Sequence, residues 1–292
     1  MVKEGDVLTN YFGEVTKSCN LDKCVAKVKE MIGWDEKYPY VKTDPHTVRS
    51  VGMAMAMQGS GIGGVDVGSV QLKLNDDGFY TLMIGCSDMG TGCDTILAQM
   101  AADGLGCDMD NIIVRGVDTD QSPYDSGSYA SSTTYVTGGA VVKACESMRK
   151  RICEEAAAIM GLKSGEVDFD GETISENDNP EHSMTLSDLI TSLEAGNGRI
   201  IEVTESHTSP VSPPPFMAGA AEIEVDLETG KITPINYVAA VDCGTVINTN
   251  LARIQTEGGI VQGMGMTLYE DVQYTEAGKM KNRNFMSYKI PT

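Results

Sequence analysis

Hydrophobic positions along the chain follow two different periods, and each period predicts a different element. Helical spacing of apolar residues and good helix formers predict helices over residues 21–32, 93–106, 133–160 and 186–194, and a last helix that begins at Asn248 or Asn250. The helix over 93–106 has a glycine stop at Gly104 or Gly106. Two-residue alternation and short apolar runs predict strands over residues 50–58, 66–74, 79–85 and 111–117, and two strands within 221–242 around the turn Glu228–Gly230. This mixture predicts an α+β fold with mixed sheets and helices packed on one face.

The predicted elements divide the chain into two subdomains. Residues 1–160 form the first, including an N-terminal helical segment over 1–45 that ends in a connecting loop from Trp34. Residues 161–292 form the second, and a polar region around 160–215 joins the two. A length of 292 residues fits one large or two ordinary domains.

Composition and charge exclude several classes of protein. A formal net charge of −20 repels a polyphosphate backbone, and the basic run Arg149–Arg151 is interpreted as a solvated helix face. The start of the chain lacks the apolar stretch of a signal peptide, and no run reaches the ~18 apolar residues of a membrane helix, which predicts a cytoplasmic protein. The eight cysteines contain no C-x-x-C pair and the three histidines form no zinc-like cluster, so reduced thiols are expected and no side-chain metal site.

The glycine-rich stretch Gly59–Gly64, GSGIGG, matches the dinucleotide-binding pattern G-x-G-x-x-G. That pattern has a mechanism only where a helix follows, because the helix N-terminus binds the pyrophosphate. Here VDVGSVQLKL follows, which alternates like a strand. The stretch is therefore predicted to be a glycine-rich turn.

Two other segments combine small residues with the start of a predicted helix. Gly90 and Gly92 flank Thr91 before the helix at 93–106, and the hydroxyl-rich stretch 125–140 precedes and enters the helix at 133–160. Unpaired N–H groups at helix starts, with hydroxyls, can neutralise an anion without lysine or arginine. Serine and threonine also cap helices and fill turns, and composition alone leaves both interpretations open.

Three stretches together resemble the xanthine dehydrogenase and aldehyde oxidase family. They are residues 87–144, from SDMGTGCDT to TGGAVVKA, residues 223–248, IEVDLETGKITPINYVAAVDCGTVIN, and residues 253–265, RIQTEGGIVQGMG. The resemblance is to the C-terminal part of the molybdopterin-binding region, and it follows the same order along nearly the whole chain. Even the first residues, MVKEGD, are similar to a segment inside that region.

The resemblance implies which residues bind the cofactor. They are Gly90, Thr91, Gly92, Ala130, Ser131, Ser132, Thr133 and Gln255. Relatives usually carry glutamine at the position of Thr91, where its side chain binds the pterin; the shorter threonine puts that contact in question and leaves the backbone N–H groups. For Gln255 the alternative is a buried helix polar group bonded to backbone.

The resemblance identifies no catalytic residue in this chain. The glutamate that acts as the base in relatives lies beyond the segment matching SYKIPT, and Glu257 in QTEGG does not match it. The second subdomain is therefore expected to be incomplete at its C-terminus, with the chain truncated at Thr292 or a partner supplying the glutamate. The start at MVKEGD fits the medium molybdopterin subunit of a split enzyme such as nicotinate dehydrogenase.

The implied cofactor is a molybdopterin dinucleotide, with cytosine favoured, whose dithiolene holds the molybdenum. Since the sequence has no iron-sulfur cysteine spacing and no flavin site, FAD and 2Fe-2S clusters are expected on partner subunits, beside a large molybdopterin subunit. The implied reaction is hydroxylation of an N-heteroaromatic substrate with oxygen from water. Nicotinate is favoured, xanthine or another purine comes next, and aldehydes are an alternative. Two other possibilities stay open: a non-catalytic scaffold subunit and a binding protein for a simple phosphate ester.

Overall fold

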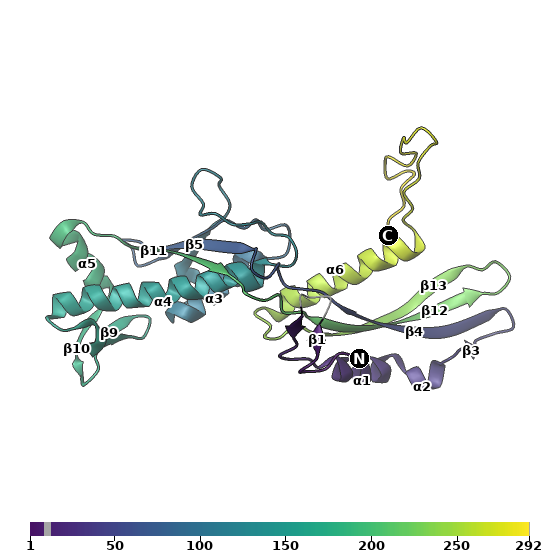
Figure 1. Cartoon of the computed structure of the whole chain (residues 1–292), viewed down its shortest axis with the longest axis horizontal. Helices are drawn as coiled ribbons and strands as arrows, with labels where there is room; N and C mark the ends of the chain where they lie inside the picture. Colours follow the sequence, from purple (N-terminus) through teal and green to yellow (C-terminus); the bar gives the residue numbers. More distant parts are fainter. Residues whose placement is uncertain (9–12, 292) are drawn as a thin grey trace. The chain divides into compact units, whose positions relative to one another are not determined.

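The computed structural model describes residues 1–8 and 13–291, which form two compact units. The larger unit consists of Met1–Asp88 and Cys93–Thr245, and the smaller unit of Met89–Gly92 and Val246–Thr292. Helices and mixed sheets are both present (Figure 1), so the predicted α+β class is confirmed. Within the described residues, no helix is both long and apolar enough to span a membrane.

One four-stranded sheet of the larger unit has the order β11-β5-β6-β7. Its strands are β5 (Val67–Leu74), β6 (Tyr80–Ile84), β7 (Ile112–Arg115) and β11 (Ile201–Thr208). Neighbouring strands are antiparallel except β6 and β7, which run parallel and are joined by the crossover helix α3 (Cys93–Leu105). Alternate residues of β5, such as Val70 and Leu72, are fully buried, as the two-residue period predicts.

The long helix α4 (Thr133–Met160) packs on β5, β11 and α3. Glycines on α4 permit this close approach. A Cβ at Gly138 would lie 2.7 Å from the Met100 methyl, and a Cβ at Gly139 would collide with the His207 ring of β11. The packing fixes the N-terminus of α4 at the end of the sheet where β5 begins, and this positions the hydroxyl-rich segment before it.

A second four-stranded sheet of the larger unit has the order β13-β12-β4-β3. Its strands are β3 (Val41–Lys42), β4 (Thr47–Met57), β12 (Phe216–Asp226) and β13 (Ile232–Asp242). Helix α1 (Leu21–Ile32) covers it with the residues that the helical spacing selects. The shared core consists of Cys24, Val28, Ile32, Val51, Ala218 and Ala220.

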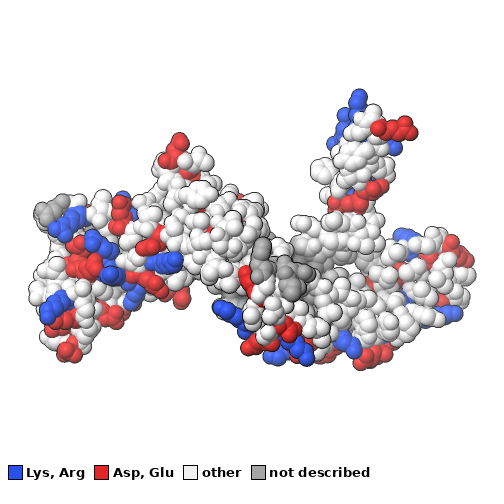
Figure 2. All heavy atoms as spheres, in the orientation of Figure 1, with Lys and Arg blue, Asp and Glu red and all other residues white. Residues whose placement is uncertain are grey.

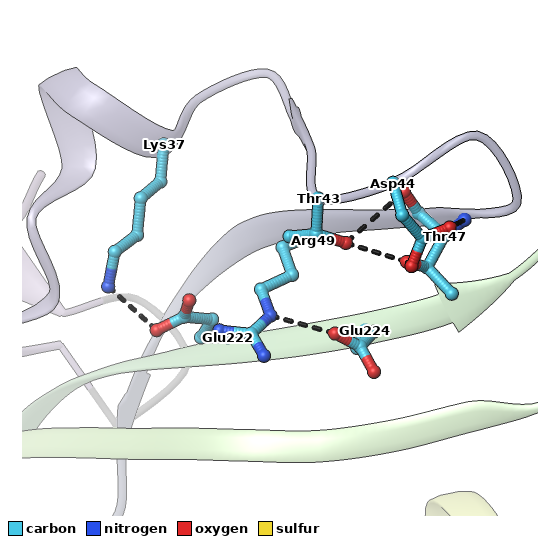
Figure 3. Close-up of polar contacts among 7 residues, drawn as sticks. All are labelled: Lys37, Thr43, Asp44, Thr47, Arg49, Glu222 and Glu224. Carbon is cyan, nitrogen blue, oxygen red and sulfur yellow. Dashed lines mark hydrogen bonds and ion pairs between the residues drawn. The ribbon is translucent and has the colours of Figure 1, made fainter.

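Ion pairs join helix α2 and strand β4 to β12 (Figure 3). Helix α2 (Trp34–Lys37) ends in Lys37, whose Nζ lies 2.7 Å from Oε2 of Glu222. Arg49 of β4 pairs with Glu224 at 2.9 Å. Glu222 is only 6% exposed, so its carboxylate depends on Lys37 for compensation of its charge.

Shorter elements complete the larger unit. A three-stranded sheet contains β8 (Val167–Phe169), β9 (Thr173–Glu176) and β10 (Asn179–Thr185), next to α5 (Leu186–Asn197), and β1 (Val7–Leu8) pairs with β2 (Glu14–Val15). Thr185 caps α5 by accepting from the Asp188 N–H at 3.1 Å.

The smaller unit is built on helix α6 (Thr249–Leu268). Asn248 is its N-cap, because its side-chain oxygen accepts from the Leu251 N–H at 3.0 Å. Of the two caps that the sequence allowed, the structure selects Asn248.

Several predicted elements are confirmed with the same bounds, and others are wrong. Helices 21–32 and 133–160 are α1 and α4. The helix predicted over 186–194 is confirmed as α5, which extends to Asn197. Two segments that the sequence predicted as irregular are not: α2 and β3 lie within 34–45, and the polar region 160–215 also contains strands β8 to β11. The division of the chain at residue 160 into two cofactor-binding subdomains stays a prediction, although β11 and β12 pair with strands from before that residue.

The basic run at 149–151 is also not a purely solvated face. Arg149 is part-buried, donates to the carbonyls of Leu105 and Phe169, and lies 5.4 Å over the Phe169 ring. Lys150 and Arg151 pair with Glu154. In the view of Figure 2, basic side chains alternate with acidic ones instead of gathering into one patch. The prediction against nucleic-acid binding rests on the net charge of the chain, and the contacts of this basic run do not test it.

Candidate functional site

The segment before α4 has an unusual backbone. Ala130 has φ of 50° and Ser131 of 58°, so two consecutive non-glycine residues are left-handed. Such residues are sparse, and they persist only where surrounding contacts determine them. Within residues 1–8 and 13–291, neither backbone N–H of this pair donates to a protein acceptor. Successive N–H groups in such turns form a concave anion-binding nest.

The hydroxyls of this segment mostly bind the protein itself. The Ser128 hydroxyl donates to the Ser87 carbonyl at 2.8 Å and accepts from the Ser87 N–H at 3.0 Å. Ser132 donates to the Gly127 carbonyl, Ser126 accepts from the Val67 N–H, and Thr137 donates to Asp125. The hydroxyls thus fasten the segment to the ends of β5 and β6. Ser132 precedes α4 as its N-cap without a side-chain capping bond, and its own N–H donates to the Tyr129 carbonyl at 3.0 Å.

The glycine-rich stretch Gly59–Gly64 lies against the same segment. The Gly61 N–H donates to the Ala130 carbonyl at 2.8 Å, and the Gln58 amide donates to the Ser131 hydroxyl at 3.0 Å. Strand β5 follows the stretch, so the rejection of a dinucleotide-binding fingerprint is confirmed. Sequence reasoning did not predict this contact, because Gly61 and Ala130 are far apart along the chain.

The turn Gly90–Gly92 and Gln255 lie together in the smaller unit. Gly90 has φ of 96° and Gly92 of 77°. The Gln255 amide donates to the Gly90 carbonyl at 3.1 Å, while a Cβ on Gly92 would lie 2.7 Å from a Leu251 methyl. Gln255 is exposed, so the alternative of a buried helix group is wrong, although it does bond to backbone. This contact pairs two of the predicted site residues within the smaller unit.

Ala130–Thr133 belongs to the larger unit, and Gly90–Gly92 with Gln255 to the smaller one. The contacts that hold each group come from residues of the same unit. Glu257, which the sequence excluded as the base, is exposed and pairs with Arg253 at 3.9 Å. Its surroundings are those of an ordinary surface ion pair.

Among the described residues, one cluster of potential metal ligands lies at the start of α3, within the larger unit. Ligand atoms of Asp88, Cys93 and Asp94 lie within 4.8 Å of one another. The Asp88 carboxylate accepts from the Asp94 N–H at 3.4 Å and the Cys93 thiol contacts the Asp94 carboxylate at 3.7 Å, so the start of α3 already employs these groups. A hydrogen bond with the Cys93 thiol, and then burial, raise the pKa of the neighbouring Cys86 thiol well above its usual range, so Cys86 is not a ready thiolate ligand.

A shallow hollow of about 380 Å³ lies elsewhere, at the end of β5 against α5. Its lining includes Lys73, Asp76, Glu194 and Arg199, and none of the predicted site residues. Charges of both signs line it. It therefore has no evident connection with the predicted chemistry.

The chain matches known proteins along most of its length. The profile of the Molybdopterin cofactor-binding domain matches residues 27–292. A probable hypoxanthine oxidase of Escherichia coli is 32% identical over 94% of this chain and 28% of its own length. The nicotine 6-hydroxylase large subunit of Paenarthrobacter nicotinovorans is 29% identical over 81% of this chain and 30% of its own length.

Solved structures share the fold. Quinoline 2-oxidoreductase from Pseudomonas putida superposes with a TM-score of 0.83, at 23% identity, over 96% of this chain and 38% of that one. Reconstituted CO dehydrogenase from Oligotropha carboxidovorans gives 0.81, at 23% identity, over 96% and 37%. The chain thus spans about 30–40% of the length of these proteins. By the match over residues 27–292, the chain belongs to the molybdopterin cofactor-binding domain family.

Proposed function

We propose that this chain is the molybdopterin-binding part of a cytoplasmic molybdenum hydroxylase. The observation that carries the proposal is the family match over 27–292, combined with the left-handed pair Ala130 and Ser131 at the start of α4. The proposed cofactor-binding residues are those that the sequence named, Gly90–Gly92, Ala130–Thr133 and Gln255. A molybdopterin dinucleotide, in its cytosine form, is the proposed ligand.

The residues present fit such a group. Gly90 is left-handed, and within the described residues no atom lies within 4 Å of the position that a Cβ would take, which leaves room for a ligand against the backbone. Ala130 and Ser131 add N–H groups that have no protein acceptor in the described chain. These are neutral donors, which suit a phosphate or pterin held without cationic side chains.

When bound, the molybdenum cofactor would supply a Lewis acid and an acceptor for an electron pair, with water as the oxygen source. The chain's own contribution is placement. The Gln255 amide donates to the Gly90 carbonyl and so fixes the turn Gly90–Gly92. The Ser128 hydroxyl accepts from the N–H of Ser87, which precedes the turn in the sequence. Thr91 is exposed between two left-handed glycines, where its N–H and hydroxyl can both donate. No described residue is proposed as the catalytic base.

Partner subunits are part of the proposal. Some relatives are named as subunits, including a 6-hydroxypseudooxynicotine dehydrogenase complex subunit gamma, which is 25% identical over 99% of this chain. We assign electron transfer to partners that carry FAD and 2Fe-2S clusters, and the remaining cofactor contacts to a large molybdopterin subunit. Such cluster and flavin chemistry needs cysteine spacings and sites that this sequence lacks.

The proposed substrate is an N-heteroaromatic compound. Relatives are named for hypoxanthine, xanthine and nicotine, which are all nitrogen heterocycles. Nicotinate is the first candidate and a purine the second, because this chain has small residues near Gln58 to Gly61, where the resemblance places a phenylalanine in purine-oxidising relatives.

The proposal is tested by purifying the chain with its partner subunits and measuring molybdenum, pterin and nucleotide after denaturation. Stoichiometric molybdenum with a cytosine nucleotide is expected. Dye reduction with nicotinate, xanthine and an aldehyde then identifies the substrate class. A fully assembled complex that holds no molybdenum or pterin would instead support a scaffold subunit, and pterin-free binding of a phosphate ester would support a simple binding protein.

A further inference from the structure

The proposed function gives no role to the buried carboxylate of Asp66. Asp66 is 1% exposed and stands at the end of the glycine-rich stretch, just before β5. Its Oδ1 accepts from the Tyr129 hydroxyl at 2.6 Å, and its Oδ2 accepts from the Ile62 N–H at 2.7 Å. A buried carboxylate requires such donors, because an unpaired charge is costly away from water. Asp66 therefore joins the glycine-rich stretch to the residue that directly precedes Ala130.

The glycine-rich stretch is shaped to accept this contact. Gly61 has φ of 79°, and a Cβ there would lie 3.0 Å from Cγ2 of Val136, 3.2 Å from Oδ2 of Asp66 and 3.4 Å from Cβ of Ser132. Its N–H donates to the Ala130 carbonyl and its carbonyl accepts from the Ser212 hydroxyl at 2.6 Å. Only glycine allows the backbone to approach so closely.

The left-handed pair is thus held from both sides. Tyr129 is fixed by Asp66, the Ala130 carbonyl by Gly61, and the Ser131 hydroxyl by Gln58. Alanine and serine are strained in the left-handed region, because the Cβ lies too close to the following carbonyl oxygen. The three contacts keep the turn in a conformation that an isolated segment would leave.

We infer that Asp66 is a positioning residue that, through Tyr129 and the glycine-rich stretch, holds the N–H groups of Ala130 and Ser131 toward the anionic part of the cofactor. The inference rests on the proposed function. The inference gives the GSGIGG stretch a structural role, which is to support the turn at Ala130 and Ser131. This role differs from the phosphate binding of a dinucleotide fingerprint. The stretch acts behind the binding segment and does not itself bind the phosphate.

The first test compares Tyr129→Phe with Tyr124→Phe in the cofactor-loaded complex. Both changes remove one hydroxyl from the same loop, but Tyr124 is 71% exposed and only Tyr129 bonds to Asp66. Tyr129→Phe is expected to speed release of the pterin by about tenfold, since a hydrogen bond to a charged group is lost. The fluorescence of the released pterin measures the rate. Tyr124→Phe should match the wild type. Because Tyr129→Phe also leaves one oxygen of the buried Asp66 without its donor, the thermal midpoint of the cofactor-free protein should fall by a few degrees in this variant and stay unchanged in Tyr124→Phe. Pterin should then leave Tyr129→Phe faster than it leaves a variant of equal thermal midpoint.

The second test compares Gly61→Ala with Gly64→Ala. Both glycines are left-handed, so alanine costs similar backbone strain at each, but only Gly61 is crowded by Asp66 and Ser132, and Gly64 has open space. Gly61→Ala is expected to speed pterin release, whereas Gly64→Ala should lower stability alone. Asp66→Asn, which keeps one acceptor, should retain more pterin than Asp66→Ala.

The outcomes separate this inference from the function that it depends on. A loaded wild type whose Tyr129→Phe and Gly61→Ala variants release pterin at the wild-type rate would overturn the inference alone. Loss of pterin strictly in proportion to the thermal midpoint, across all variants, would also overturn it, because that pattern is structural. A fully assembled wild type that holds no pterin would overturn the proposed function, and the inference with it.

Discussion

At the scale of single residues, the left-handed pair Ala130 and Ser131 is the feature that most resembles a binding device. Neither residue tolerates positive φ as glycine does, yet both adopt it. The sequence has small residues and hydroxyls here, and the role of this segment in binding the cofactor stays a prediction. The sequence could not give the φ angles, which are set by Gly61, Gln58 and Tyr129.

Replacing Ala130 by glycine should make the cofactor-free chain more stable. Glycine adopts φ of 50° without a Cβ clash, so about 0.5–1 kcal/mol of stabilisation is expected after the entropy of the unfolded chain is included. The measurement is the urea-unfolding free energy. Ala140→Gly is the matched control, because Ala140 is buried within α4, where the same change should destabilise by at least about 1 kcal/mol. Destabilisation by Ala130→Gly would contradict the strain argument.

His207 should make stability depend on pH. Burial, and then the nearby Lys143 ammonium, lower the pKa of His207 below its usual 6.5, and its Nδ1 is buried without a partner among the described residues. The unfolded chain then binds a proton more readily than the folded chain, so stability is present above about pH 6.5 and is lost as pH falls below it. Thermal midpoints from pH 8 to pH 5 should fall more steeply in the wild type than in His207→Gln. Parallel curves would show that His207 does not contribute.

At the scale of elements, periodicity predicted the long helices well and the polar strands poorly. α1 and α4 carry continuous apolar faces, and their bounds were predicted. β10 was missed because nearly all its residues are exposed, so no apolar alternation marks it. β11 does alternate, but Glu205 and His207 stand on its inner face, where Glu205 accepts from Ser147 of α4 at 2.6 Å. Polar groups satisfied by a distant helix hide the two-residue period.

The contact of α2 with β12 should depend on one ion pair. Lys37→Met leaves the Glu222 carboxylate buried without its cation and should destabilise the larger unit by about 1–3 kcal/mol. Lys27→Met is the control, since the Lys27–Glu30 pair is 56% and 70% exposed and should contribute less than about 0.5 kcal/mol. Chemical unfolding of both variants measures the difference. Equal losses would mean that burial of Glu222 has no energetic effect.

At the scale of the whole molecule, the strongly acidic chain has neutral donors where an anion is proposed to bind. A net charge of −20 would oppose such a ligand at long range, so short-range N–H contacts have to provide the affinity. The sequence could name the two turns through resemblance to a family. It could not show that Gln255 binds the Gly90 carbonyl or that GSGIGG supports Ala130, since both contacts join residues far apart in the chain.

The most direct measurement is amide hydrogen exchange of the assembled complex with and without its molybdenum cofactor. Groups that bind a ligand exchange more slowly when it is present. The account predicts slower exchange in the loaded complex at Gly90–Gly92 and at Ala130–Thr133, with little change in β8 to β10. Equal exchange at both turns in the loaded and cofactor-free complexes would contradict it.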